Sequence, residues 1–185
     1  MRLILASASP RRAELLRAAG YVFETVVTDV DERRKAGETP NAYVRRLAAE
    51  KSAAALAIVK DPSAVMLGAD TTVVVDGHLL EKPVDDEDAR TMLRRLSGRA
   101  HEVLTGVSIR RGAFEVGRVA TTIVQFVVLS ADDIAWYVAS GEGRDKAGAY
   151  AIQGLASRFI PRIDGSYSNV VGLPIAAVVE LLREV

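Results

Sequence analysis

The chain has 185 residues, of which 49% are hydrophobic and 26% charged, and its 24 basic side chains equal its 24 acidic ones. This composition is typical of one globular domain, here residues 1–185, and the zero net charge argues against nucleic acid as a partner. The chain has no cysteine, which excludes disulfides and thiolate metal sites. No apolar stretch is long enough for a signal peptide or a membrane span, so we expect a cytoplasmic protein with no membrane partner.

Strand and helix patterns alternate along the chain. Apolar and β-branched runs predict strands at 3–6, 21–28, 65–75, 78–80, 103–110, 116–129 and 158–163. Helix-start residues predict helices at 10–19, 39–59, 85–96, after Ser130 and at 174–183. Because hairpins and helical crossovers both occur, the order predicts an α/β fold on a central mixed sheet flanked by helices.

The turn after the first strand has the chemistry of an anion site. Ser7 and Ser9 precede Pro10, a residue favoured at the first helical position, and Arg11 and Arg12 follow in the first turn. Basic side chains are disfavoured there by the helix dipole, whereas free N–H groups and guanidinium forks together bind phosphate well. On this segment alone, a phosphate cradle and an ordinary solvated helix start are equally good interpretations.

Asp70 interrupts an otherwise apolar strand at 65–75. A buried carboxylate needs a cation, hydrogen-bond donors or a raised pKa, so Asp70 is a candidate metal ligand or general base. The alternative is an acid at the solvated end of a strand. Glu32 on the preceding loop and Lys82 after the hairpin are candidate supporting groups, although a lysine in a turn is usually only solvated.

The segment 141–154 is rich in glycine but matches no standard nucleotide loop. Gly143 and Gly148 have P-loop spacing, yet Ala149 and Tyr150 stand where lysine and Ser/Thr belong. The amide of Gln153 has donors and an acceptor that suit a base edge, although an ordinary turn glutamine is the simpler interpretation. The two histidines of the chain form no zinc or catalytic-triad pattern.

A series of motifs covering nearly the whole chain carries a resemblance to a known family. They are LASASPRR at 5–12, VDE at 30–32, GADT at 68–71, LEKP at 80–83, LSGRAH at 96–101, DKAGAYAIQG at 145–154 and GSYSNVVGLP at 165–174. The chain resembles the Maf family of nucleoside triphosphate pyrophosphatases, once known as septum-formation inhibitors. The resemblance implies a Maf/inosine triphosphatase-like domain with a cleft, and hydrolysis of the α–β phosphoanhydride to a nucleoside monophosphate and pyrophosphate.

The resemblance also implies roles for particular residues. Asp70 would be the catalytic residue, binding a divalent cation (Mg²⁺ or Mn²⁺) and orienting or deprotonating the attacking water, and Glu32 would help to hold that cation. Phosphate or substrate contacts would come from Ser7, Ser9, Arg11, Arg12, Lys51, Thr71, Lys82 and Gln153. Phosphoryl chemistry needs such charge neutralisation, and oxygen ligands suit a hard cation. A homodimer is common among relatives, and the sequence itself leaves the oligomeric state open.

Three positions point to a branch of the family. The branch that prefers 7-methylguanosine triphosphate has tryptophan, glutamine and glutamate where this chain has Arg11, Thr71 and Gln153. The chain therefore resembles the branch acting on dTTP and UTP, whose neutral amide suits a pyrimidine edge. It departs from that branch at Gly143, near which a proline is common.

Three alternatives remain at this stage. The first is a 7-methyl-GTP pyrophosphatase of the same family. The second is a non-catalytic nucleotide-binding regulator of cell division, against which the joint presence of Glu32, Lys51, Asp70 and Lys82 argues. The third is a nucleic-acid-binding module that uses the arginine pairs, which zero net charge and 5% aromatic residues disfavour.

Overall fold

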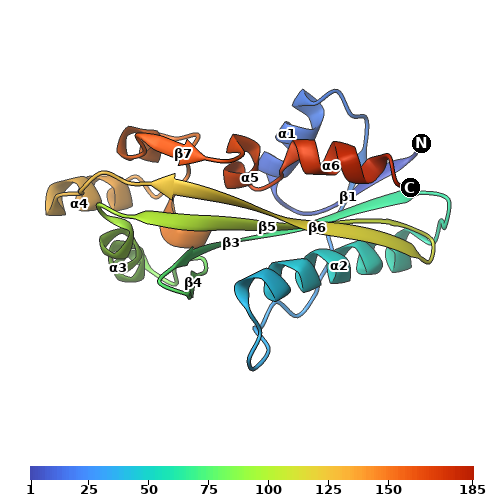
Figure 1. Cartoon of the computed structure of the whole chain (residues 1–185), viewed down its shortest axis with the longest axis horizontal. Helices are drawn as coiled ribbons and strands as arrows, with labels where there is room; N and C mark the ends of the chain where they lie inside the picture. The colour runs from blue at the N-terminus through green and yellow to red at the C-terminus, as the bar shows by residue number, and fades with distance from the viewer. The chain divides into compact units, whose positions relative to one another are not determined.

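The computed structural model describes all residues 1–185 (Figure 1). The strands are β1 (Leu3–Ala6), β2 (Glu24–Val26), β3 (Val65–Val75), β4 (His78–Leu80), β5 (Ala100–Arg111), β6 (Phe114–Gln125) and β7 (Arg162–Asp164). The helices are α1 (Pro10–Ala18), α2 (Pro40–Val59), α3 (Asp86–Leu96), α4 (Ala131–Ala139), α5 (Tyr167–Val171) and α6 (Ile175–Leu182). Two 3₁₀ segments are η1 (Ala147–Ala149) and η2 (Leu155–Phe159).

The seven strands form one mixed sheet, as the sequence predicts. Their order is β2-β1-β3-β5-β6-β7, with β4 paired to β3. Strand β1 runs parallel to β2 and β3, whereas the β3–β4 and β6–β7 pairs are antiparallel. The α/β class is therefore confirmed, while the cleft stays a prediction.

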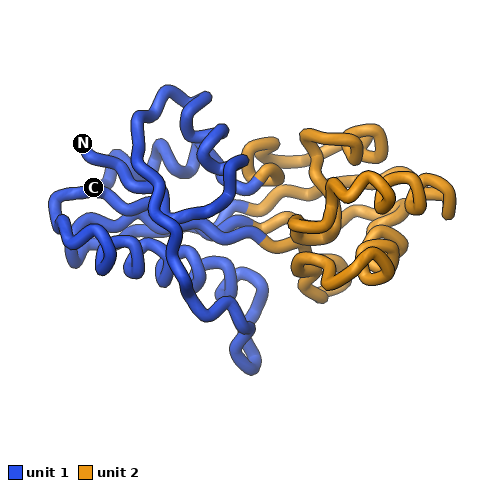
Figure 2. Tube along the Cα trace, turned by 180° about the vertical axis from the view of Figure 1, so that it is seen from behind, with its two compact units in different colours: residues 1–71, 105–120, 172–185 blue, residues 72–104, 121–171 orange.

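The chain forms two compact units, coloured separately in Figure 2. The first comprises residues 1–71, 105–120 and 172–185, and the second comprises residues 72–104 and 121–171. Strands β3, β5 and β6 contribute residues to both units. None of the helices combines the length and the apolar character that a membrane crossing requires.

The first unit buries both faces of its central strands. In β1, Leu3 and Leu5 belong to a core shared with α1 and α6, whereas Ile4 and Ala6 belong to a second core against α2. A parallel strand covered on both faces has no polar side, which is why β1 is apolar throughout.

Helix α2 lies unusually close to the strands beneath it. It begins at the Thr39 cap, whose side chain accepts a hydrogen bond from Ala42 N, and it ends at Lys60 in a left-handed conformation (φ 53°). A Cβ added at Gly68 would lie 2.2 Å from the Ala48 carbonyl oxygen, and one at Gly106 would lie 2.1 Å from that of Val44. The helix and the sheet therefore meet backbone to backbone, which only glycine permits.

The second unit has a single core built from α3, α4, β4 and the remaining parts of the long strands. Its centre holds the T-shaped rings of His101, Phe126 and Tyr150. Helix α4 starts with a capping box in which Ser130 and Asp133 each accept from the backbone of the other, as serine at this position predicts.

Several predicted boundaries are wrong. Of the strand expected at 158–163, residues 158–159 end the 3₁₀ segment η2, and only Arg162–Asp164 pairs in the sheet. The first residue of η2 is held from a distance, since Leu155 N donates to the Glu142 carboxylate at 2.9 Å. The strand expected at 21–28 is only Glu24–Val26, because Tyr21 and Phe23 turn into the apolar core. The second hairpin strand ends at Gln125 rather than 129, and helix α5 was not predicted.

Candidate functional site

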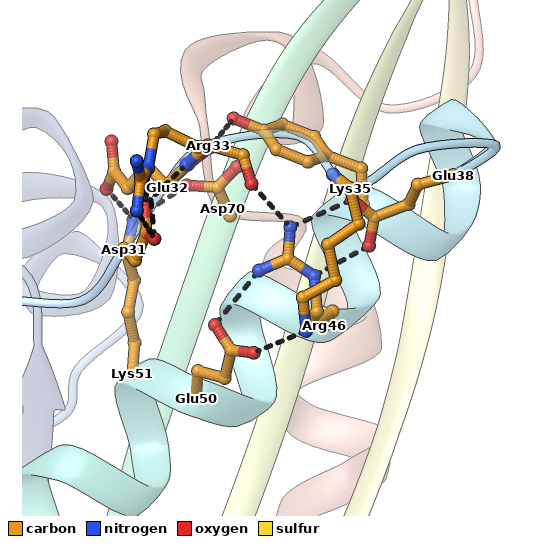
Figure 3. Close-up of polar contacts among 10 residues, drawn as sticks. Asp31, Glu32, Arg33, Lys35, Glu38, Arg46, Glu50, Lys51 and Asp70 are labelled. Atoms are coloured by element: carbon orange, nitrogen blue, oxygen red, sulfur yellow. Dashed lines mark hydrogen bonds and ion pairs between the residues drawn. The ribbon is translucent and has the colours of Figure 1, made fainter.

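Two carboxylates converge on one ammonium in the first unit. Asp70 lies in the middle of β3 and is only 8% exposed, and Lys51, equally buried, projects from α2. Lys51 Nζ lies 2.7 Å from Asp70 Oδ1 and 2.7 Å from Glu32 Oε1 (Figure 3). The cation that a buried Asp70 requires is thus Lys51, and the three groups together keep one net negative charge.

The loop that carries Glu32 lies against α2. The Tyr43 hydroxyl donates to the Glu32 carbonyl at 2.9 Å. The carboxylate of the neighbouring Asp31 pairs instead with the Arg33 guanidinium, whose Nη2 donates to Asp31 Oδ2 at 2.6 Å. This hydrogen bond lowers the pKa of Asp31. Two adjacent acids therefore have different partners, and only Glu32 joins Lys51 and Asp70.

Arg46, also on α2, is the centre of the polar network in Figure 3. Its Nε and Nη2 atoms donate to the two Glu38 carboxylate oxygens at 2.6 and 2.8 Å, and its Nη1 lies 3.0 Å from Glu50 Oε2. Its Nη2 also reaches the Arg33 carbonyl at 3.2 Å. The bidentate pair lowers the pKa of Glu38 to about 2, so this contact is fully ionised at neutral pH.

The Arg12 side chain is held by hydrogen bonds to the turn after β1 and to neighbouring segments. Its Nη1 donates to the Ala69 carbonyl at 2.9 Å and to Ser7 Oγ at 3.3 Å, its Nε to the Gly172 carbonyl at 2.7 Å, and its Nη2 to Thr71 Oγ1 at 3.0 Å. Burial lowers the pKa of this guanidinium from its ordinary value. These contacts hold the turn beside Asp70, which follows Ala69 directly.

The predicted phosphate turn has one unexpected detail. The helix starts at Pro10 as predicted, but Ser9 makes no side-chain capping bond. Ser7 Oγ instead accepts from Ser9 N at 3.1 Å, so the Ser7 hydroxyl organises the turn. Arg11 is half-buried on α1.

The structure thus gathers the predicted site residues into groups. Glu32 and Asp70 both contact Lys51, and Ser7 and Thr71 both contact Arg12. Ser9 and Arg11 lie at the start of α1, and Lys82 and Gln153 are exposed residues of the second unit.

Sequence reasoning missed the residues that hold the Glu32 loop. Tyr43, Arg46 and Glu50 have helical i, i+3, i+7 spacing and so share one face of α2, which is the signal that was available. Their partners on the loop could not be read from spacing, since a loop has no fixed period.

A family model described as "Maf-like protein" matches residues 2–185. The chain belongs to the Maf family. Curated relatives named "dTTP/UTP pyrophosphatase" are similar over their full length. Those of Shewanella oneidensis (52% identity, 100% of this chain and 98% of the relative), Symbiobacterium thermophilum (51%, 99% and 93%) and Vibrio cholerae (50%, 99% and 97%) are examples.

The Maf chain also shares its fold with a solved structure. The Staphylococcus aureus Ham1 protein superimposes with a TM-score of 0.51 and 14% identity, covering 100% of this chain and 97% of that one. At this identity the likeness supports the fold of the Maf protein and nothing about its site.

Proposed function

We propose that this Maf protein hydrolyses the α–β phosphoanhydride of dTTP and UTP, releasing a nucleoside monophosphate and pyrophosphate. The observation that carries the proposal is the convergence of Glu32 and Asp70 on Lys51 Nζ. The relatives named dTTP/UTP pyrophosphatase, about half identical over the full length, support the same activity. Modified pyrimidine triphosphates would be substrates of the same site. The role of the enzyme, as a homodimer, would be to remove such nucleotides from the cytoplasmic pool.

The donor set fits Mg²⁺ or Mn²⁺. Mg²⁺ is usually held by one or two carboxylates together with substrate phosphates and water, rather than by a cage of protein ligands. Glu32 and Asp70 supply two carboxylates, and no group of three or more His, Cys, Asp or Glu side chains gathers anywhere in the structure. When bound, the cation would neutralise charge on the phosphate oxygens.

Side chains of the protein itself would position the attacking water and bind the phosphates. Asp70, fixed in a buried strand, would accept a hydrogen bond from the attacking water, and Lys51 would offset phosphate charge from a position already ordered by two ion pairs. We assign Ser7, Ser9, Arg11, Arg12 and Lys82 to the phosphates. Thr71 and Gln153 are assigned to the nucleoside.

The test is pyrophosphate release from a panel of canonical and modified nucleoside triphosphates with Mg²⁺ or Mn²⁺. We expect turnover of dTTP and UTP, lowered by about 10²–10⁴-fold in Asp70→Asn. Asp61→Asn is the matched control, because Asp61 is a partly exposed acid of the same unit, paired to Arg2. Turnover of 7-methylguanosine triphosphate instead would overturn the pyrimidine assignment. Absence of turnover with every nucleotide would favour the non-catalytic regulator.

A further inference from the structure

The backbone around Glu32 is held by two side chains that take no part in the proposed reaction. The Tyr43 hydroxyl donates to the Glu32 carbonyl at 2.9 Å, and Arg46 Nη2 donates to the Arg33 carbonyl at 3.2 Å. These are successive carbonyls of the chain, so the peptide plane between Glu32 and Arg33 and the one after it are both fixed. The first of these planes contains the Glu32 Cα, from which the side chain leaves the backbone, and the second holds the next residue in place.

Arg46 is itself held from several directions. Its side chain is 15% exposed, and its main partner Glu38 is 8% exposed. Glu50, one turn later on α2, takes a third donor at 3.0 Å, and the guanidinium lies over the Tyr43 ring at 5.6 Å from the centroid. Bidentate geometry and shielding from solvent distinguish this arrangement from an ordinary surface ion pair, which contributes little.

Helix α2 therefore contacts both the backbone and the carboxylate of Glu32. Tyr43 and Arg46 hold its backbone, and Lys51, further along α2, contacts its carboxylate at 2.7 Å. Lys51 also reaches Asp70 at 2.7 Å, so a shift of the loop relative to α2 would separate the two carboxylates. Figure 3 shows Arg46 and Lys51 on the side of α2 that faces Glu32 and Asp70.

We propose that Arg46 and Tyr43 are positioning residues that aim the Glu32 carboxylate at the divalent cation shared with Asp70. The inference rests on the proposed function, since it assumes that Glu32 and Asp70 share a cation. It assigns no contact with substrate to either residue. Both act through the backbone of the loop, and their loss should weaken cation binding more than the chemical step.

The adjacent residue Arg45 offers a matched control. Arg45 lies on the same helix and pairs with a single glutamate, Glu115, at 2.9 Å, but none of its contacts is with the Glu32 loop. Arg45→Gln and Arg46→Gln therefore remove the same charge and the same chemical group from neighbouring positions. Only Arg46→Gln releases the loop.

The experiment measures the Kd of Mn²⁺ by electron paramagnetic resonance, in the presence of non-hydrolysable α,β-methylene-dTTP. Loss of residues that orient metal ligands typically costs 10–100-fold in affinity, so we expect the Kd to rise by about that factor in Arg46→Gln. Tyr43→Phe keeps the ring and removes one hydrogen bond, so a smaller rise is expected. Arg45→Gln should keep the wild-type Kd, and turnover of Arg46→Gln should recover at saturating Mn²⁺.

Measuring the same substitution in a Glu32→Gln protein separates a positioning role of Arg46 from a merely structural one. If Arg46 acts through Glu32, then Arg46→Gln should cause no further rise of the Mn²⁺ Kd when Glu32 is already replaced by glutamine. Equal Kd values for the two arginine variants, or an undiminished effect in the Glu32→Gln background, would overturn the proposal. Should Arg46→Gln fail to fold, Tyr43→Phe decides the question by the same measurement. Wild-type pyrophosphate release with no shift of Kd rejects the positioning alone, whereas no release by wild type rejects the proposed function.

Discussion

Replacing Gly68 with alanine should push α2 away from β3 and separate Lys51 from Asp70. The new Cβ would lie 2.2 Å from the Ala48 carbonyl oxygen and 2.8 Å from Ser52 N, both of them backbone atoms of α2. Ordinary contact begins near 3.4 Å, so the helix must retreat by about 1.2 Å. A Lys51–Asp70 distance of 2.7 Å would then grow to about 3.9 Å without a change of rotamer, beyond hydrogen-bond length.

Two costs follow from this displacement. Overpacking of a closely packed interior destabilises by about 1–3 kcal/mol, and a misplacement of about 1 Å at a catalytic group costs on the order of 10²-fold in rate. Urea unfolding measures the first, and pyrophosphate release from dTTP measures the second. Gly20→Ala is the control, because Gly20 has a positive φ of 84° but no atom within 4 Å of the added Cβ. It should lose about 1–2 kcal/mol of stability and no activity. A Gly68→Ala protein with wild-type activity would refute the argument.

Two further predictions concern the core of the second unit. Burial lowers the pKa of His101 from 6.5 to about 4. Between these pH values the histidine is protonated in the unfolded chain but not in the folded protein, so the free energy of unfolding falls as the pH is lowered. From neutral pH to about pH 4.5 the loss attributable to this group is about 2–3 kcal/mol. Denaturant unfolding at the two pH values should show this loss in wild type and in His78→Gln, a control at an exposed histidine, but not in His101→Gln. Tyr137→Phe removes a hydroxyl that donates to Glu142 Oε2 at 2.8 Å and accepts from Ala151 N at 3.1 Å. We expect a loss of about 1–3 kcal/mol in urea unfolding; a change no larger than that of Tyr167→Phe, at a half-exposed tyrosine, would contradict this reasoning.

The elements with strong local signals were predictable from sequence. Helix α2 begins at Pro40 after the Thr39 cap, and β3 covers Val65–Val75, the range that its apolar and β-branched residues indicate. The anomaly of Asp70 was equally visible, because a carboxylate in such a strand must be compensated. Its partner Lys51 was not visible from local pattern and came from the family resemblance, since the two residues lie 19 positions apart on different elements.

What could not be predicted depends on contacts between distant segments. The Glu142 carboxylate contacts the backbone where η2 begins, although nothing near Leu155 in the sequence indicates this contact. The same holds for Arg46, whose partners Glu38 and Arg33 precede it by 8 and 13 residues in an irregular loop. Local propensity carries no information about such contacts, and the three-dimensional arrangement alone supplies it.

Residues 172–185 complete the unit in which the carboxylates lie. Leu173, Val178 and Leu181 are buried in the core of β1 and β3, and the Gly172 carbonyl takes the Arg12 Nε at 2.7 Å. A ribosome therefore makes Glu32, Lys51 and Asp70 well before it makes the segment that covers their core. A product that stops before residue 172 would contain all of the proposed catalytic side chains, but its core would lack Leu173, Val178 and Leu181. The apolar surface left exposed would make such a product a target for proteolysis rather than an enzyme.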